Sequence, residues 1–524
     1  MIITKKIRFI TLISIFATFS SVIQVYAHDT PNDAGTLQLG QLDSIFDQFL
    51  ILAGIGIFFF IIFLSIWLIN SKRKEVQNPK TYLEKINSFG MNARLYILHI
   101  QGMSLTYGVR TILFNLYLLF LFQNGIMFLG THYDTLIFIG VVLAIGSLVS
   151  GIVSPFSGII VDYIGKKWSF ISGDFLGAMT ILLAIIFPDP LTIILLQIVR
   201  SAVMSIHTIA EGPFIYEQSS AKERVHLFSV SSGMSTLASM SGNLIGGFVP
   251  LVFAFVLYNS VTVTGPETIF IIQVGLFISV LLWLGSLIPA FFLKEEKKVV
   301  LKEQDYNISA RLSFRNVKNW PTVLVFVFNS IFVGLGAGLF VSFFSVFFLI
   351  YYKATTMEIA MIFALGSLFI ALGNFISPVL SERYGKVNAI VFTRLIGIPF
   401  MILLPLGIFM PILAPIYFGA IFYLIRAFSH NATAPTEDAL AMEVVDDSER
   451  TTMEALREAG ASIFSALGFF IGGYMMSIND FVTPFVLAAI FYSLAVFIFW
   501  SYFKNNKSLV LKKIDEGKDS VVSL

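Results

Sequence analysis

The sequence predicts an all-α, polytopic membrane protein made of two pseudo-symmetric six-helix bundles and one extra amino-terminal transmembrane helix. Hydrophobic residues fill 56% of its 524 positions and charged residues only 13%, about half the share that a soluble domain carries. A hydrocarbon core about 30 Å thick requires roughly 20 mainly apolar residues per helix. One leading segment, 48–70, meets this length. Twelve more follow, at 94–122, 135–157, 168–187, 190–217, 226–257, 268–293, 321–351, 358–380, 388–409, 411–441, 452–477 and 481–503.

The twelve spans fall into two related halves, because charged and glycine positions recur at fixed offsets. The residues matched at an offset of 226 are Arg200 with Arg426, Glu217 with Glu443, Arg224 with Arg450, and Gly246-Gly247 with Gly472-Gly473. The residues matched at an offset of 220 are Asp162 with Glu382, Gly165 with Gly385, and Lys166 with Lys386. An internal repeat built from apolar helices is typical of a transporter, in which two related bundles move about a site held between them.

The amino terminus predicts a signal peptide over residues 1–27, followed by an added span. Basic residues precede an apolar run, and Val25-Tyr26-Ala27 offers small residues for cleavage after Ala27. Residues 28–91 would then comprise an external tail, the extra transmembrane helix and a cytoplasmic linker. If the signal is retained as an anchor, the topology downstream is unchanged.

Lysine and arginine predict the orientation, since cytoplasmic loops carry an excess of them. They gather in alternate loops, whereas the predicted outside loops contain only Lys353. We therefore expect a multi-pass protein of the plasma membrane with its amino-terminal tail outside and its carboxy terminus in the cytoplasm. The remaining divisions are an amino-terminal bundle at 92–293, a cytoplasmic central loop at 294–320, a carboxy-terminal bundle at 321–503 and a cytoplasmic tail at 504–524.

Short charged motifs in both halves resemble those of the major facilitator superfamily. The segment Gly158-Ile-Ile-Val-Asp162-Tyr-Ile-Gly165-Lys166-Lys167 resembles its G-x-x-x-D-x-x-G-[RK]-[RK] signature. A weaker second copy contains Glu382, Arg383, Gly385 and Lys386. Glu217 with Arg224, and Glu443 with Arg450, resemble the E-x6-R element of sugar porters. The resemblance covers about residues 92–505 and implies two six-helix bundles, a central cavity and alternating access.

We interpret these motif residues as a cytoplasmic latch that holds the inner side shut in the outward-open state. The residues of the latch are Gly158, Asp162, Gly165, Lys166, Glu217, Arg224, Glu382, Arg383, Gly385, Lys386, Glu443 and Arg450. The alternative is plain topology and neutralisation of helix ends. The latch is favoured because charges at membrane depth cost several kcal/mol unless they are paired.

Charges within the spans predict a pathway for substrate and protons. Arg200, His207 and Glu211 are spaced so that they share one face of a helix, and the second half repeats this stripe. The residues assigned to the pathway are Arg110, Arg200, His207, Glu211, Arg426, His430 and Glu437. We expect Glu211 or Glu437 to carry the coupling proton, and Arg110 or Arg426 to attract an anionic group of the substrate.

Each of these assignments has a structural alternative. The two arginines at the repeated position either hold helices together or contact substrate, and the two glutamates either carry protons or pair with nearby arginines. A histidine in a span is often only a hydrogen-bonded helix contact. Asp174 and Arg394 occupy equivalent positions one helical depth from the signature, so we assign them to the latch. Glycines at four-residue spacing indicate close helix packing, and Gly334, Gly336 and Gly338 indicate either a bendable gate helix or packing.

The sequence offers nothing that indicates an enzyme. It lacks a P-loop, a metal-ligand spacing, a cofactor motif and a nucleophile constellation, and it contains no cysteine. No feature indicates nucleic-acid binding. The predicted function is secondary active transport of a small solute by alternating access, coupled to protons, within the lipid bilayer. The alternative is a non-transporting membrane sensor or assembly partner of the same fold, for which an intact latch would have no use.

Overall fold

The fold is described from a computed structural model. The structure describes residues 81–505 apart from 123, 129–130, 134, 259–265, 296–316, 345–346, 349–350, 355 and 411–414. The predicted signal peptide, the extra amino-terminal span, most of the central loop and nearly all of the carboxy-terminal tail lie outside these residues.

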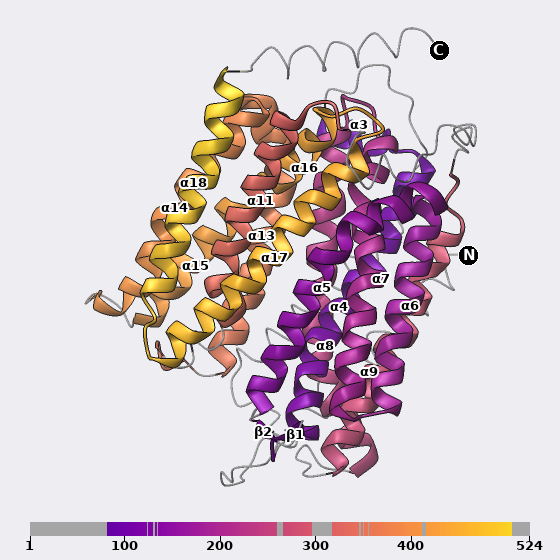
Figure 1. The fold of residues 1–524 in the computed structure, drawn as a ribbon, viewed down its shortest axis with the longest axis vertical. Helices are drawn as coiled ribbons and strands as arrows, with labels where there is room; N and C mark the ends of the chain where they lie inside the picture. Colours follow the sequence, from indigo (N-terminus) through magenta and orange to yellow (C-terminus); the bar gives the residue numbers. More distant parts are fainter. Residues whose placement is uncertain are drawn as a thin grey trace, which may run out of the picture.

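Six long helices form the amino-terminal bundle, coloured indigo to magenta in Figure 1. They are α4 (Met91–Leu121), α5 (Thr135–Ile164), α6 (Lys166–Ile186), α7 (Pro190–Glu217), α8 (Arg224–Tyr258) and α9 (Pro266–Phe291). A short helix, α3 (Tyr82–Asn87), precedes them. It begins with a capping box, in which Thr81 accepts a hydrogen bond from the Glu84 amide and the Glu84 carboxylate accepts one from the Thr81 amide.

The second bundle, orange to yellow in Figure 1, repeats this arrangement. Its helices are α11 (Trp320–Phe340), η1 (Val341–Phe343), α13 (Thr356–Tyr384), α14 (Lys386–Leu406), η2 (Gly407–Phe409), α15 (Pro415–Asn431), α16 (Ala434–Glu443), α17 (Arg450–Ser477) and α18 (Thr483–Asn505). Nine helices in the described ranges are long and apolar enough to cross a membrane. The prediction of an all-α polytopic membrane protein is confirmed.

One local prediction is wrong. The expected span at 411–441 is two helices, because α15 ends at Asn431 and α16 begins at Ala434. Pro435 has no amide hydrogen to donate, and its ring would clash with the carbonyl four residues earlier, so a continuous helix is disfavoured there. The connection from α4 to α5 also contains an antiparallel pair of strands, β1 (Ile126–Phe128) and β2 (Thr131–Tyr133), in which Ile126 pairs with Tyr133.

Glycine shapes the repeated turns at one end of the molecule. Gly165 and Gly385 are the residues before α6 and α14, with φ of 85° and 79°. Only glycine adopts these angles without strain. The signature glycines therefore reverse the chain tightly between consecutive helices in each bundle.

Glycines also bring two helix pairs into backbone contact. A Cβ added to Gly242 of α8 would lie 2.0 Å from the Leu105 carbonyl oxygen of α4. In the second bundle, a Cβ on Gly472 of α17 would lie 2.0 Å from the Leu339 carbonyl oxygen of α11. Gly338 of α11 packs against Gly468 of α17 in the same interface. These glycines serve packing, so the bendable-gate interpretation of the α11 glycines has no support in their contacts.

Exchange of Gly242 for valine is expected to lower the free energy of unfolding by at least about 1–3 kcal/mol, because overpacking forces α4 and α8 apart. Gly285→Val is the matched control, since a Cβ at Gly285 would meet nothing within 4 Å. Thermal unfolding in detergent measures both. Equal unfolding temperatures for the two variants would contradict the close approach.

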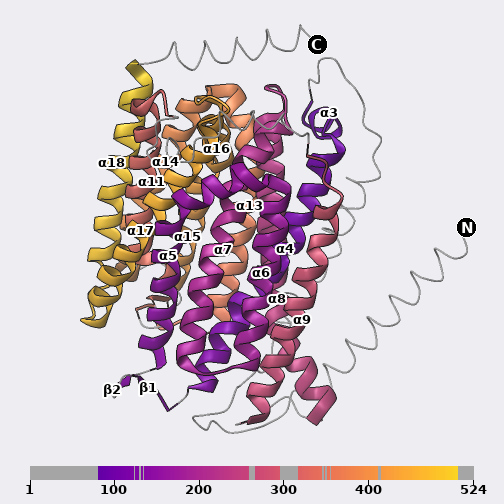
Figure 2. The same cartoon turned by 45° about the vertical axis from the view of Figure 1, so that its right-hand side comes forward.

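The most extensive contacts between the bundles join α5 with α17 and α8 with α13. Ser147 of α5 donates a hydrogen bond to the Ser462 carbonyl of α17 at 3.1 Å. Asn374 of α13 donates one to Thr236 of α8 at 3.3 Å. Figure 2 shows α3 and α16 at one end of the molecule and β1 and β2 at the opposite end. We call the end with α3 and α16 the closed end, for the contacts described below.

Candidate functional site

Charged residues bridge the two bundles at the closed end. Arg224 at the start of α8 donates to Glu443 at the end of α16, with 3.2 Å between nitrogen and oxygen. Lys386 of α14 also binds the Glu443 carboxylate. Arg224 is 8% exposed and the Glu443 side chain 9%, so the pair is shielded from solvent. Such pairing keeps one bundle fixed against the other.

A tyrosine joins the two arginines of the repeated E-x6-R element. The guanidinium carbons of Arg224 and Arg450 lie 3.5 Å and 3.3 Å from the centroid of the Tyr216 ring. Arg450 comes from α17 and Tyr216 from α7, so the second contact crosses between bundles. Each desolvated cation–π contact is worth about 2 kcal/mol. Sequence reasoning missed Tyr216, although it immediately precedes Glu217.

The signature aspartate makes another contact between bundles. Asp162 of α5 accepts a hydrogen bond from the Thr451 hydroxyl of α17 at 2.8 Å. A Cβ on Gly158 would sit 3.4 Å from the Thr451 carbonyl oxygen and from the Ala455 side chain. The small residue therefore allows α5 and α17 to approach each other beside this hydrogen bond.

Helix α3 also contacts the carboxy-terminal bundle at the closed end. Lys85 pairs with Glu382 of α13, which also lies 3.5 Å from His226 of α8. The Tyr82 hydroxyl donates to the Phe375 carbonyl of α13 at 3.1 Å. Burial, with a further contribution from Glu382, raises the pKa of Tyr82 to about 12. The sequence analysis assigned this segment to a cytoplasmic linker, although Thr81-x-x-Glu84 is a capping-box signal for a helix start.

The other predicted latch residues lie at the same end with local roles. Lys166 pairs with Glu217 at 3.1 Å, within the amino-terminal bundle. Arg383 is exposed and lies over the Tyr384 ring, 5.4 Å from its centroid. Gly165 and Gly385 form the turns described above.

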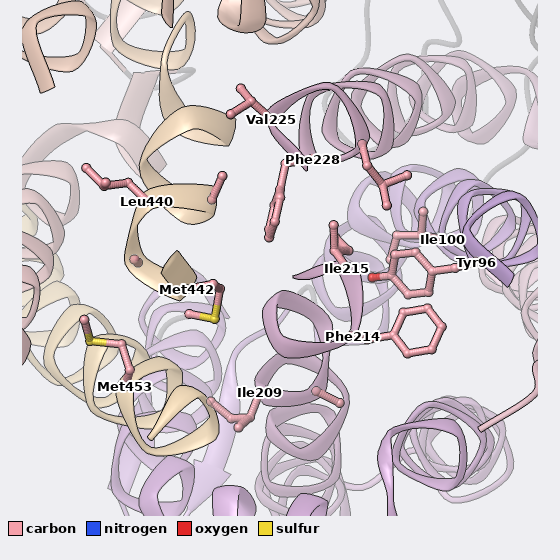
Figure 3. Close-up of a cluster of buried hydrophobic side chains, with 14 of the residues drawn as sticks. Tyr96, Ile100, Ile209, Phe214, Ile215, Val225, Phe228, Leu440, Met442 and Met453 are labelled. Carbon is pink, nitrogen blue, oxygen red and sulfur yellow. The ribbon is translucent and has the colours of Figure 1, made fainter. Parts of the chain in front are cut away.

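An apolar layer lies beside these charges. Figure 3 shows side chains of α7 and α8 facing those of α16 and α17. Ile209, Leu440, Met442 and Met453 are each 0% exposed within this cluster. Closely packed apolar side chains leave no space for water. The closed end is therefore sealed by packing as well as by charge.

Two of the predicted pathway arginines lie together in the amino-terminal bundle. Arg110 of α4 is 8% exposed, and its guanidinium carbon lies 4.6 Å from the Trp283 ring centroid. Arg200 of α7 donates to Gln197 at 3.1 Å. Arg110 and Arg200 are close enough to repel each other electrostatically. Neither makes an ion pair with a carboxylate in the described part of the chain.

Arg426, the counterpart of Arg200 in the second bundle, also has no acidic partner among the described residues. Arg426 of α15 is 6% exposed and lies over the Phe340 and Phe344 rings, 4.8 Å and 5.6 Å from their centroids. Its Nε atom is buried and has no hydrogen-bond partner. His430, one turn along α15, packs against the Tyr492 ring at 5.0 Å.

Glu437 of α16 is held inside the carboxy-terminal bundle. It binds Arg394 of α14 and the Asn329 amide of α11, and Arg394 donates to Asn329 at 2.9 Å. All three are at most 6% exposed. Arg394 thus belongs to a buried triad rather than to the latch expected for it, because its guanidinium neutralises a carboxylate inside the bundle.

An acidic cluster that the sequence analysis missed surrounds Arg457 of α17. Asp438 and Glu454 lie 2.9 Å and 3.0 Å from its guanidinium nitrogens. Glu458 accepts a hydrogen bond at 3.2 Å from Ser150 of α5, in the opposite bundle. The sequence signal was three charges within five residues of one apolar span, which is rare unless functional.

Glu211 of α7 faces this cluster from the amino-terminal bundle. A Cβ on its neighbour Gly212 would lie 3.5 Å from Glu454, and Glu211 is an electrostatic neighbour of both His207 and Asp438 and lies beside Tyr96. His207, by contrast, turns into its own bundle towards Asp174 at 3.0 Å. The side chains of His207 and Glu211, predicted to share one face of the helix, therefore point towards different neighbours. Asp174 itself is 0% exposed and lies among helices of that bundle, away from the latch expected for it.

Two related helical bundles that close against each other at one end, with buried charges between them, define a membrane transport protein. The chain matches the sequence profile of the Major Facilitator Superfamily over residues 112–425 and 398–522, and it belongs to that superfamily. Comparison with curated protein sequences finds no match.

Solved structures of low sequence identity share this fold. An outward-facing bacterial homologue of the iron transporter ferroportin has a TM-score of 0.60 and 14% identity, covering 79% of this chain and 99% of that one. The human organic anion transporter MFSD10 (TETRAN) has a TM-score of 0.55 and 13% identity, covering 78% and 99%. The E. coli fucose:proton symporter has a TM-score of 0.58 and 14% identity, covering 78% and 99%.

Proposed function

We propose that this transporter moves a small anionic solute by alternating access and couples that movement to protons. The observation that carries the proposal is the set of three arginines, Arg110, Arg200 and Arg426, that lack an ion pair among the described residues. An uncompensated charge away from water costs several kcal/mol. An anionic solute between the bundles would supply the missing negative charge.

Alternating access is supported by the kinds of contact that join the two bundles at the closed end. Its contacts between bundles are a few ion pairs, hydrogen bonds and cation–π contacts beside one apolar layer. Such contacts exchange readily when one bundle rocks against the other. We assign the closed end to the cytoplasm of a plasma-membrane protein, because Lys166, Lys167 and Arg224 lie there.

Proton coupling is supported by the charge count around Arg457. Glu454 is an electrostatic neighbour of Glu211, Asp438 and Glu458, and Arg457 lies within ion-pair distance of Asp438 and Glu454. Protons bound to this group would reduce its excess negative charge. The Asp438 side chain is 42% exposed, so the group has access to water. Glu437 is neutralised by Arg394, which favours Glu211 over Glu437 as the proton carrier.

Proteins of this fold include examples of anion transport and of proton coupling. One structural neighbour is an organic anion transporter and another is a fucose:proton symporter. The choice of an anion for this chain rests on its own arginines.

A thermal-shift screen of the purified protein against small anions, neutral sugars and cations tests the cargo. An anion present at 100 times its dissociation constant is expected to stabilise the protein by about 2.7 kcal/mol. The variants Arg110→Gln and Arg426→Gln are expected to lose that stabilisation. Arg383→Gln, at an exposed arginine, is expected to keep it. Stabilisation by uncharged solutes alone would reject the anion, and an absence of any ligand response would favour the non-transporting alternative.

A further inference from the structure

A buried cluster in the amino-terminal bundle joins two histidines and an aspartate from three helices. His99 lies on α4, Asp174 on α6 and His207 on α7. The Nε2 atom of His99 is 3.3 Å from Oδ2 of Asp174, and Nδ1 of His207 is 3.0 Å from Oδ1. One ligand atom from each residue fits within a span of 4.8 Å. Donors about 2.0–2.2 Å from a shared tetrahedral metal ion lie roughly 3.3–3.6 Å apart, close to the two nitrogen–oxygen distances here.

The cluster is enclosed and its polar atoms are unsatisfied. His99 and Asp174 are 0% exposed and His207 is 1% exposed. Although the nitrogen and oxygen atoms are close, they are not aligned as hydrogen bonds. Both Asp174 oxygens, Nε2 of His99 and both nitrogens of His207 lack a well-aligned hydrogen bond, although His207 and the Trp283 indole lie close enough to Asp174 to interact with it. Buried polar atoms are normally paired, so this geometry fits a cation held between the three side chains.

The orientation of His99 fits a metal ligand. Its Nδ1 atom lies 2.8 Å from the Ser286 carbonyl oxygen of α9. A carbonyl only accepts, so Nδ1 carries the hydrogen, and the neutral ring presents the Nε2 lone pair to the cluster. Histidines that bind metals usually donate their second N–H in this way, which fixes the ring.

Two glycines allow the helices to approach closely enough to form the cluster. A Cβ on Gly102 of α4 would lie 2.6 Å from the Ser286 side chain, and one on Gly173 of α6 would lie 3.1 Å from Cβ of His207. The first glycine brings His99 to its carbonyl partner. The second brings Asp174 to His207.

We propose that His99, Asp174 and His207 bind a divalent first-row transition-metal ion that ties α4, α6 and α7 together. Two imidazoles and one carboxylate suit Zn²⁺ and its neighbours, whereas Mg²⁺ and Ca²⁺ prefer oxygen ligands alone. The site lies inside one bundle and does not depend on which solute is transported. Local sequence spacing does not reveal it, because each ligand comes from a different helix.

Metal content of the purified full chain tests the site. The affinity tag must contain no histidine, because a polyhistidine tag binds the same ions. After addition of Zn²⁺ or Co²⁺ and removal of excess, elemental mass spectrometry is expected to find about one ion per chain. Asp174→Asn and His207→Gln are expected to bind the ion at least about 100-fold more weakly. His226→Gln, at a buried histidine of α8, is the control that keeps the ion.

A variant that gains a signal separates loss of a ligand from loss of the fold. His207→Cys places a thiolate in a chain without cysteine, so bound Co²⁺ is expected to show a sulfur-to-metal charge-transfer band that the wild type lacks. Absence of that band overturns the proposal. A wild type that retains no ion does so as well, because a cluster that holds only protons would give this result. Equal metal content in Asp174→Asn and the wild type is the third contrary outcome.

Discussion

Replacement of Glu211 by glutamine is expected to abolish proton-driven accumulation while binding and exchange of the solute persist. The amide cannot release a proton, so the acidic cluster around Arg457 loses the member contributed by the amino-terminal bundle. Exchange requires only that the loaded carrier move between its two states. Proteoliposomes measure both, as uptake driven by an imposed pH gradient and as counterflow without a gradient.

Glu437→Gln is the informative comparison, since the structure gives this glutamate a different role. Its loss would leave Arg394 buried without its carboxylate, and breaking a buried pair costs about 3–5 kcal/mol. We therefore expect a lower unfolding temperature for Glu437→Gln and a near-normal one for Glu211→Gln. Accumulation by Glu211→Gln with unchanged pH dependence would remove Glu211 from coupling and leave another ion or facilitated diffusion.

Reversal of the charge at Arg224 is expected to open the closed end. The variant Arg224→Glu sets two carboxylates against each other where Arg224 meets Glu443, and it removes one cation from the Tyr216 ring. A coupling of about 1–3 kcal/mol changes the ratio of closed to open molecules roughly 5- to 150-fold. Labels at Tyr163→Cys and Asn388→Cys report the distance, because both positions are exposed and the chain has no cysteine.

The double variant Arg224→Glu with Glu443→Arg is expected to recover part of the closed population, because it restores the pair with reversed sign. Lys318→Glu is the matched control, since Lys318 and Asp446 form an exposed pair, 72% and 43% exposed, within one bundle. Exposed pairs contribute about 0–1 kcal/mol. A distance distribution in Arg224→Glu that matches the wild type would exclude this ion pair as part of the latch.

The sequence predicted the position of some site residues, whereas the contacts of others could not be predicted from it. The repeat correctly indicated that Arg224 and Glu443 belong to one end, because the turns between helices recur at fixed offsets. It did not show that the ion pair would join the two copies of the E-x6-R element, nor that Tyr216 would lie between Arg224 and Arg450. Helical periodicity placed His207 and Glu211 on one face, but it carries no information about the neighbouring helices that divide this face between two environments.

The sequence by itself determined that the chain is a helical membrane protein with two related halves, because apolar length and repeated charge are local properties that survive any arrangement of helices. Only the tertiary structure decided which buried charges are neutralised. Arg394 meets Glu437 and Arg457 meets Asp438 across helices of the carboxy-terminal bundle, and Asp174 lies beside His99 and His207 from two other helices. A buried charge depends on its neighbours within a few ångströms, and packing alone supplies those neighbours.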